Sequence, residues 1–203
     1  MHRIDTFVVW MGGVVTQHLT QTVVEVLEGH GRPTDIRTRR ALVDLEADLC
    51  RGAMQAEDFC KRVVEVGGAP FDAETLETAI PQRLAVMPGM PALLGELAEA
   101  YRLRLVVGFP RQWALPVVER AGVAGCFSEP VLFTAAYGLA DCGPALLEKL
   151  LAAGEIVRDS TLWVDDHPHR AMSAIRLGID AAIFVDAPRL RRDLGLWSLL
   201  PLR

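Results

Sequence analysis

The chain has 203 residues, of which 51% are apolar and 23% are charged. These values exclude a disordered chain and indicate one compact protein with enough apolar side chains for a sizeable core. The net charge of −5 argues against a nucleic-acid-binding surface, which is usually basic, and all the basic residues except Lys61 and Lys149 are arginine.

The first predicted strand is Thr6–Trp10, a β-branched and aromatic run that stops at a glycine pair. From about residue 19 to residue 80 the apolar periodicity is helical in four segments, and turns rich in glycine and proline separate them. The apolar positions of the four segments are Val23, Val24, Val26 and Leu27; Ile36, Leu42, Val43, Leu45 and Leu49; Phe59, Val63 and Val64; and 76–80. No strand signal interrupts this stretch, which is therefore predicted to be helical throughout.

After residue 91 the predicted helices and strands alternate. Helices are expected at 92–101, 113–121, 144–153 and 169–177, and strands at 103–107, 131–133, 161–164 and 181–185. This alternation predicts right-handed βαβ units and a parallel sheet with helices on both faces. Ligands of such sheets bind beyond the carboxyl ends of the strands, so the residues that follow each strand are the candidates for a site.

The cysteines and the apolar runs give expectations about the surroundings of the protein. Cys50, Cys60, Cys126 and Cys142 share no CxxC spacing, which favours reduced thiols over a zinc site. No apolar run reaches the roughly 18 residues of a membrane span, and the N-terminal residues lack the apolar segment of a signal peptide. We expect a cytoplasmic protein that binds neither nucleic acid nor membrane.

Four segments near the predicted strand ends carry a family resemblance. They read FVVWMGGVVT at 7–16, MPGMPALLGELAEAYRLRLVVGFP at 87–110, GLADCGP at 138–144 and LWVDDHPHRAMSAIRLGI at 162–179. In this order they resemble the haloacid dehalogenase (HAD) superfamily, in the branch that carries a small helical cap after the first strand. The resemblance implies a three-layer α/β, Rossmann-like parallel sheet, with a core formed by 1–16 and 86–203 and a cap at 17–85.

The resemblance also implies catalytic groups that this chain lacks. The family places a nucleophilic aspartate after the first strand, where this sequence has Trp10, and commonly a second aspartate where it has Gly12. Gly108 stands in place of the serine or threonine of the second motif, and Asp141 in place of the lysine of the third. An indole can neither attack as a carboxylate nor ligate Mg²⁺, so these positions predict a degenerate active site.

Asp165 and Asp166 follow the fourth predicted strand, where the family holds acids that help to bind Mg²⁺. They could form a weak metal site, or they could be a loop pair that caps the next helix. His167 and His169 could add nitrogen ligands for a transition metal. We expect no cofactor, apart from a weak Mg²⁺ site at the two aspartates.

Two interpretations of Trp10 remain open in the sequence. Its ring could fill the cleft, or it could form a pocket with Asp141, Asp165 and Asp166 that binds a cationic ligand or an arginine of a partner. No basic residue is assigned to this cleft, so without a metal the acids would repel a phosphate.

Two other features lie outside the motifs. The arginines between positions 37 and 40 and between 189 and 192 are interpreted as solvated helix faces. The apolar tail at 194–202 must pack on the core or on another subunit, so a homodimer is possible.

The sequence therefore predicts a HAD-like hydrolase homologue that has lost catalysis and is kept for a binding, regulatory or assembly role. Its partner would be an unknown small molecule or protein. The alternative is an active hydrolase, of the phosphatase or dehalogenase type, in which Asp165 or Asp166 activates a metal-bound water.

Overall fold

The computed structural model describes residues 3–128, 130–140 and 143–201. Within them a single parallel sheet runs in the strand order β3-β2-β1-β4-β5. Its strands are β1 (Thr6–Trp10), β2 (Arg102–Val107), β3 (Leu132–Phe133), β4 (Thr161–Asp165) and β5 (Asp180–Ile183). The parallel sheet predicted from the alternation of helices and strands is thus confirmed, and β1 lies at its centre.

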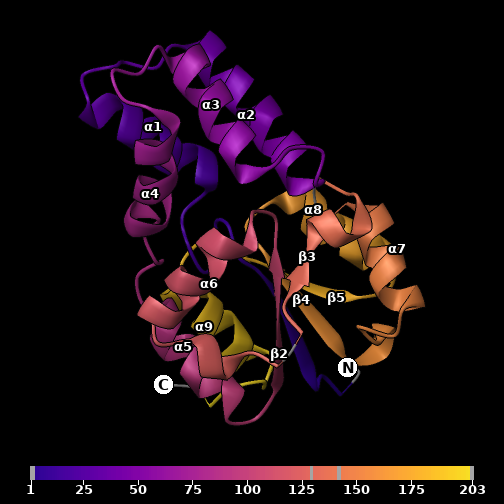
Figure 1. Cartoon of the computed structure of the whole chain (residues 1–203). Helices are drawn as coiled ribbons and strands as arrows, with labels where there is room; N and C mark the ends of the chain where they lie inside the picture. The colour runs from indigo at the N-terminus through magenta and orange to yellow at the C-terminus, as the bar shows by residue number, and fades with distance from the viewer. Residues whose placement is uncertain (1–2, 129, 141–142, 202–203) are drawn as a thin grey trace.

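Helices cover both faces of this sheet, which gives the predicted three-layer α/β architecture (Figure 1). One face carries α5 (Met90–Ala98), α6 (Arg111–Arg120) and α9 (Ala187–Leu196), and the other carries α7 (Pro144–Ala152) and α8 (Pro168–Arg176). Each of β1, β2 and β4 is buried along nearly its whole length, as expected of a sheet covered on both sides.

The bounds of helix α9 were not predicted from the sequence, although its arginines were interpreted as a helix face. Its N-terminus is capped by Asp186, whose side chain accepts a hydrogen bond of 2.7 Å from the backbone N–H of Arg189. Leu190 and Leu194 lie one helical turn apart and are buried, so a narrow apolar stripe anchors an otherwise polar helix.

The tail after α9 packs back on the sheet domain. Leu200 is buried, and the hydroxyl of Tyr101 donates a hydrogen bond of 2.7 Å to the carbonyl of Leu199. Within α9, Arg191 makes a two-pronged ion pair with Glu96 of α5, at 2.8 and 2.9 Å, so the interpretation of this arginine as merely solvated is wrong. The tail is therefore part of the fold.

The predicted helical stretch forms a lobe beyond the carboxyl ends of the strands (Figure 1). It consists of α1 (Leu19–Gly29), α2 (Ile36–Cys50), α3 (Ala56–Gly67) and α4 (Ala73–Arg83). The two chain segments that lead into and out of the lobe are hydrogen-bonded to each other, from Gln17 N to Ala85 O and from Met87 N to Val15 O, both at 2.9 Å. This pairing fixes where the lobe begins above the sheet.

Two expectations from the composition can be compared with the described residues. Cys60 and Cys126 are free thiols, whereas Cys142 lies outside the described part of the chain. In that part no helix has the length and apolar character needed to cross a bilayer.

Candidate functional site

Trp10, Gly108 and Asp165 meet at the carboxyl edge of the sheet. Trp10 ends β1 and Asp165 ends β4, while Gly108 directly follows β2. Because β1 lies between β2 and β4, the Trp10 side chain is flanked by the ends of both neighbours. It is only 6% exposed, as expected of a ring that fills the cleft.

The ring of Trp10 occupies the space that a side chain at position 108 would need. A Cβ added to Gly108 would lie 2.8 Å from Cη2 and 3.0 Å from Cζ2 of the indole, closer than carbon atoms can pack. At Gly12 an added Cβ would lie 3.7 Å from the indole Nε1, which is an ordinary contact. Glycine at 108 is therefore a packing requirement of Trp10, whereas glycine at 12 is not.

A guanidinium covers the other side of the Trp10 ring. The Cζ atom of Arg170, on α8, lies 4.9 Å from the centre of the ring, in the geometry of a cation–π contact. The same guanidinium makes ion pairs of 2.9 Å with Asp165 and 3.1 Å with Asp166. One arginine thus links the aromatic ring to both acids of the predicted metal site.

The carboxylate of Asp165 is fully buried and surrounded by donors. Its Oδ1 accepts hydrogen bonds from the backbone N–H of His167 at 2.9 Å and from Nε of Arg170 at 3.0 Å. Its Oδ2 accepts one from the indole of Trp163 at 3.2 Å. Burial raises the pKa of Asp165, and the charge of Arg170 opposes that effect.

The carboxylate of Asp166 is shared between two cations. Arg170 holds Oδ1, and Nε2 of His18, the residue before α1, lies 2.9 Å from Oδ2. The backbone of Gly13 passes so close that a Cβ there would be 2.4 Å from the carboxyl carbon, and its φ of +86° also favours glycine. The second glycine of the pair therefore makes room for Asp166.

The ion pair between His18 and Asp166 changes the pKa of both groups. The hydrogen bond with Asp166 is the main cause that raises the pKa of His18, and it outweighs the opposing effect of burial. Burial alone would raise the pKa of Asp166, but the hydrogen bond from His18 and the charges of His18 and Arg170 hold it below its usual value. The pair thus favours a protonated imidazole beside an ionised carboxylate.

This arrangement does not fit Mg²⁺, the ion implied by the resemblance. Mg²⁺ takes oxygen ligands in near-octahedral geometry, and the side chain of Trp10 offers no oxygen. The carboxylate oxygens of Asp165 and Asp166 already accept hydrogen bonds from side chains or backbone. The positive charge beside them belongs to Arg170.

The histidines that follow the aspartates do not complete a metal cluster. Within the described residues no three His, Cys, Asp or Glu side chains are grouped closely enough to hold a metal ion. The contact of His167 with Asp165 is a hydrogen bond from the backbone N–H of the residue that precedes α8. The described residues therefore do not support His167 and His169 as further ligands.

A cavity of about 220 Å³ remains between the strand ends and α2. Trp10, His18 and Arg170 line it from the sheet side, and Glu46 and Cys50 of α2 line it from the lobe. The carboxylate of Glu46 accepts a hydrogen bond of 3.1 Å from the backbone of Thr20. Below the pKa of His18, the described side chains around the cleft comprise two cations, Arg170 and His18, and three anions, so together they carry no net positive charge.

The expectation that no basic residue reaches this cleft is wrong. Arg170 is there, and the sequence contains its signal, because a residue four positions after Asp166 on a helix lies on the same helical face. The pocket predicted for the arginine of a partner is occupied by this chain's own Arg170. The other member of that predicted pocket, Asp141, lies outside the described residues.

Comparison with known proteins supports the fold alone. No family model matches the sequence, and no curated protein matches it. Among solved structures, a HAD family enzyme from Bacteroides thetaiotaomicron in a magnesium complex is 17% identical, with a TM-score of 0.73 over 93% of this chain and 98% of that chain. A predicted HAD-like family hydrolase from Porphyromonas gingivalis is 19% identical, with a TM-score of 0.69 over 94% and 98%.

A further structural neighbour carries a covalent ligand. L-2-haloacid dehalogenase from Xanthobacter autotrophicus, with chloropropionic acid covalently bound, is 17% identical to this chain, with a TM-score of 0.65 over 98% of this chain and 85% of that one. The chain described here therefore has the fold of HAD-family enzymes.

Proposed function

We propose that this protein has kept the HAD fold without its hydrolytic chemistry and acts as a non-catalytic binding protein, in a regulatory or assembly role. The observation that carries the proposal is the guanidinium of Arg170, which stacks on Trp10 and pairs with Asp165 and Asp166. In this arrangement the acids serve a structural ion pair instead of a reaction.

The first support is the missing nucleophile. Covalent catalysis in this fold needs a carboxylate at the end of the first strand, and the side chain there is the buried indole of Trp10. Loss of a covalent nucleophile lowers turnover by about 10⁴- to 10⁶-fold in enzymes that depend on one. Gly108 cannot regain a hydroxyl side chain while the ring stays in place.

The second support is the charge of the cleft. A hydrolase that uses Asp165 or Asp166 to activate a metal-bound water would have to release Arg170 from both carboxylates. That release would break charge-assisted hydrogen bonds of 3.0 and 3.1 Å and the contact with the ring. Because one partner is fully buried, leaving it unpaired is costly.

The third support is the remaining space. A cavity of about 220 Å³ lies between Trp10 and α2, with polar groups on two sides. Its volume lies below the roughly 300–1,000 Å³ of sites for drug-sized ligands, but an aromatic wall with a few fixed polar groups suits a smaller molecule. Without net positive charge, this cavity is unsuited to a phosphate dianion.

An assay separates the two functions. Wild-type protein would be incubated with Mg²⁺ and p-nitrophenyl phosphate, and separately with 2-chloropropionate, beside an active HAD-family phosphatase as the assay control. Asp165→Asn and Asp159→Asn would be purified identically, since Asp159 is exposed and precedes β4, whose opposite end carries Asp165. We expect wild-type turnover equal to the protein-free blank, and a melting temperature that millimolar Mg²⁺ does not change.

Turnover that Asp165→Asn abolishes and Asp159→Asn retains would overturn the proposal in favour of an active hydrolase. Turnover present in all three preparations would come from a contaminating enzyme and would leave the wild type without activity of its own. The variant Trp10→Asp alone is expected to stay inactive, because Arg170 and Gly108 remain in place.

A further inference from the structure

A second cavity lies at the opposite end of the sheet from Trp10. It has a volume of about 310 Å³ and opens beside β5, the edge strand. Its wall includes Ile4, which precedes β1, Leu162 near the start of β4 and Asp180 at the start of β5. It therefore sits at the amino ends of the strands and is independent of the site described above.

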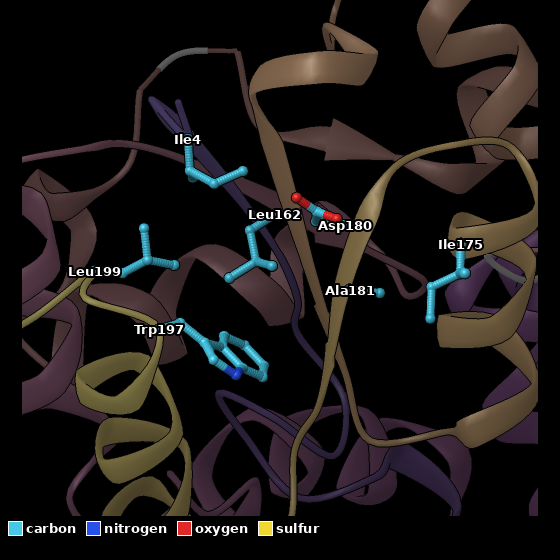
Figure 2. Close-up of a pocket in the computed structure, with 7 residues that line it drawn as sticks. All are labelled: Ile4, Leu162, Ile175, Asp180, Ala181, Trp197 and Leu199. Carbon is cyan, nitrogen blue, oxygen red and sulfur yellow. The ribbon is translucent and has the colours of Figure 1, made fainter. Parts of the chain in front are cut away.

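The lining is apolar with one aromatic side. Figure 2 shows Ile4, Leu162, Leu199 and Trp197 gathered on one side of β5, with Ile175 on the other side. Ile4 and Leu162 are 7% and 3% exposed and form the floor, whereas Trp197 is 37% exposed at the rim. The tail after α9 supplies Trp197 and Leu199, and its packing against the sheet creates the cavity.

Among the described residues that line the cavity, Asp180 has the only ionisable side chain. Asp180 is exposed, and its carboxyl group lies beside Leu162 (Figure 2). In the described part of the chain it has neither a hydrogen-bond donor nor a cationic partner. A carboxylate at the rim of an apolar pocket attracts a cation, and the face of an indole does the same.

We propose that this cavity binds an organic cation, namely an ammonium group on a compact apolar body. The ammonium would pair with Asp180, and the apolar body would lie on Leu162 and Ile4 beside the Trp197 ring. The volume falls within the range of small-molecule sites, which are largely apolar and carry few polar groups. The proposal is independent of whether the Trp10 cleft is catalytic.

The test uses 2-phenylethylamine as the probe and the neutral 2-phenylethanol as its isostere. The chain has four tryptophans, so the indole N–H signals of a ¹⁵N-labelled sample can be followed separately, and Trp197→Phe identifies the signal of Trp197. We expect the amine to shift the Trp197 signal saturably, with a dissociation constant on the order of 1 mM for so small a ligand. The signals of the buried Trp113 and Trp163 should stay unchanged.

Asp180→Asn should weaken binding of the amine about tenfold, the size of one charge-assisted contact, and leave binding of 2-phenylethanol unchanged. Asp44→Asn is the matched control, because Asp44 is exposed on α2 in the other lobe. Equal affinity of wild type for the amine and the alcohol, or an unchanged amine affinity of Asp180→Asn, would overturn the proposal. A Trp197 signal that shifts with protein concentration, together with sedimentation data that show a dimer, would also overturn the proposal. That result would assign this surface to a second copy of the chain.

Discussion

The ion pairs of Arg170 can be tested by replacing it with methionine. Methionine keeps an unbranched apolar side chain against the Trp10 ring but removes the guanidinium that holds Asp165 and Asp166. The carboxylate of Asp165 is then left fully buried with only the neutral donors Trp163 and His167. We expect Arg170→Met to lower the free energy of unfolding.

The structure sets the size of this loss. Removing one partner of a buried ion pair typically costs about 3–5 kcal/mol. The lower end applies here because the Arg170 side chain is 15% exposed and Asp166 keeps its contact with His18. A loss of about 3 kcal/mol corresponds to a fall in melting temperature of about 6–12 °C for a chain of this length.

Urea unfolding followed by circular dichroism measures the change, with unfolding midpoints compared at constant slope. Arg176→Met is the matched control, since Arg176 lies exposed on the same helix, and it should change the stability by less than about 1 kcal/mol. A double-mutant cycle with Asp165→Asn should give a coupling energy of about 1.5–3 kcal/mol. A loss below 1 kcal/mol in Arg170→Met, or a coupling indistinguishable from zero, would refute the role assigned to this ion pair.

Three further predictions concern the neighbours of this ion pair. Gly108→Ser should destabilise the wild type by about 1–3 kcal/mol, because its Cβ would lie 2.8 Å from the Trp10 ring. In the Trp10→Ala background the same substitution should be nearly neutral, and equal losses of unfolding free energy in urea would contradict this. The raised pKa of His18 means that its pair with Asp166 stabilises the fold fully below pH 6.5 and loses that effect as the pH rises through the folded-state pKa, so His18→Gln should flatten the pH dependence of the urea midpoint. Gly13→Ala should cost about 2 kcal/mol, because φ is +86° and its Cβ would meet the Asp166 carboxyl group; a melting temperature equal to that of wild type would refute this.

Most of the fold could be predicted because local sequence patterns indicate the strands of the sheet and the helices between them. β1 occupies Thr6–Trp10 as predicted, since its apolar run ends at glycines. The alternation of helices and strands gave the parallel sheet in the same way. α9 was missed because its stripe has only Leu190 and Leu194 within an arginine-rich run, although Pro188 near its start is a signal for a helix N-terminus.

The site was predictable only in part. Strand ends in a parallel sheet meet at one edge, so Trp10, Gly108 and Asp165 could be placed together without coordinates. The partners of the acids could not be placed with the same ease. His18 contacts Asp166 only because the lobe packs on the sheet, which the sequence does not show. Arg170 lies four residues after Asp166, a spacing that indicates a contact, but a comparison of motifs for metal ligands does not consider an arginine.

The arrangements of Trp10, Gly108 and Asp165 depend on one another physically. The indole fits only because position 108 has no side chain. The guanidinium of Arg170 packs on the face of the indole and pairs with the carboxylates. Placing an aspartate at position 10 alone would remove the ring that packs on Gly108 and add a third carboxylate beside Arg170. The three carboxylates together would bind the guanidinium more strongly. Under the proposed function, Trp10→Asp alone is therefore expected to produce a void and a tighter ion pair instead of a nucleophile, and activity would require the ring, the glycine and the arginine to change together.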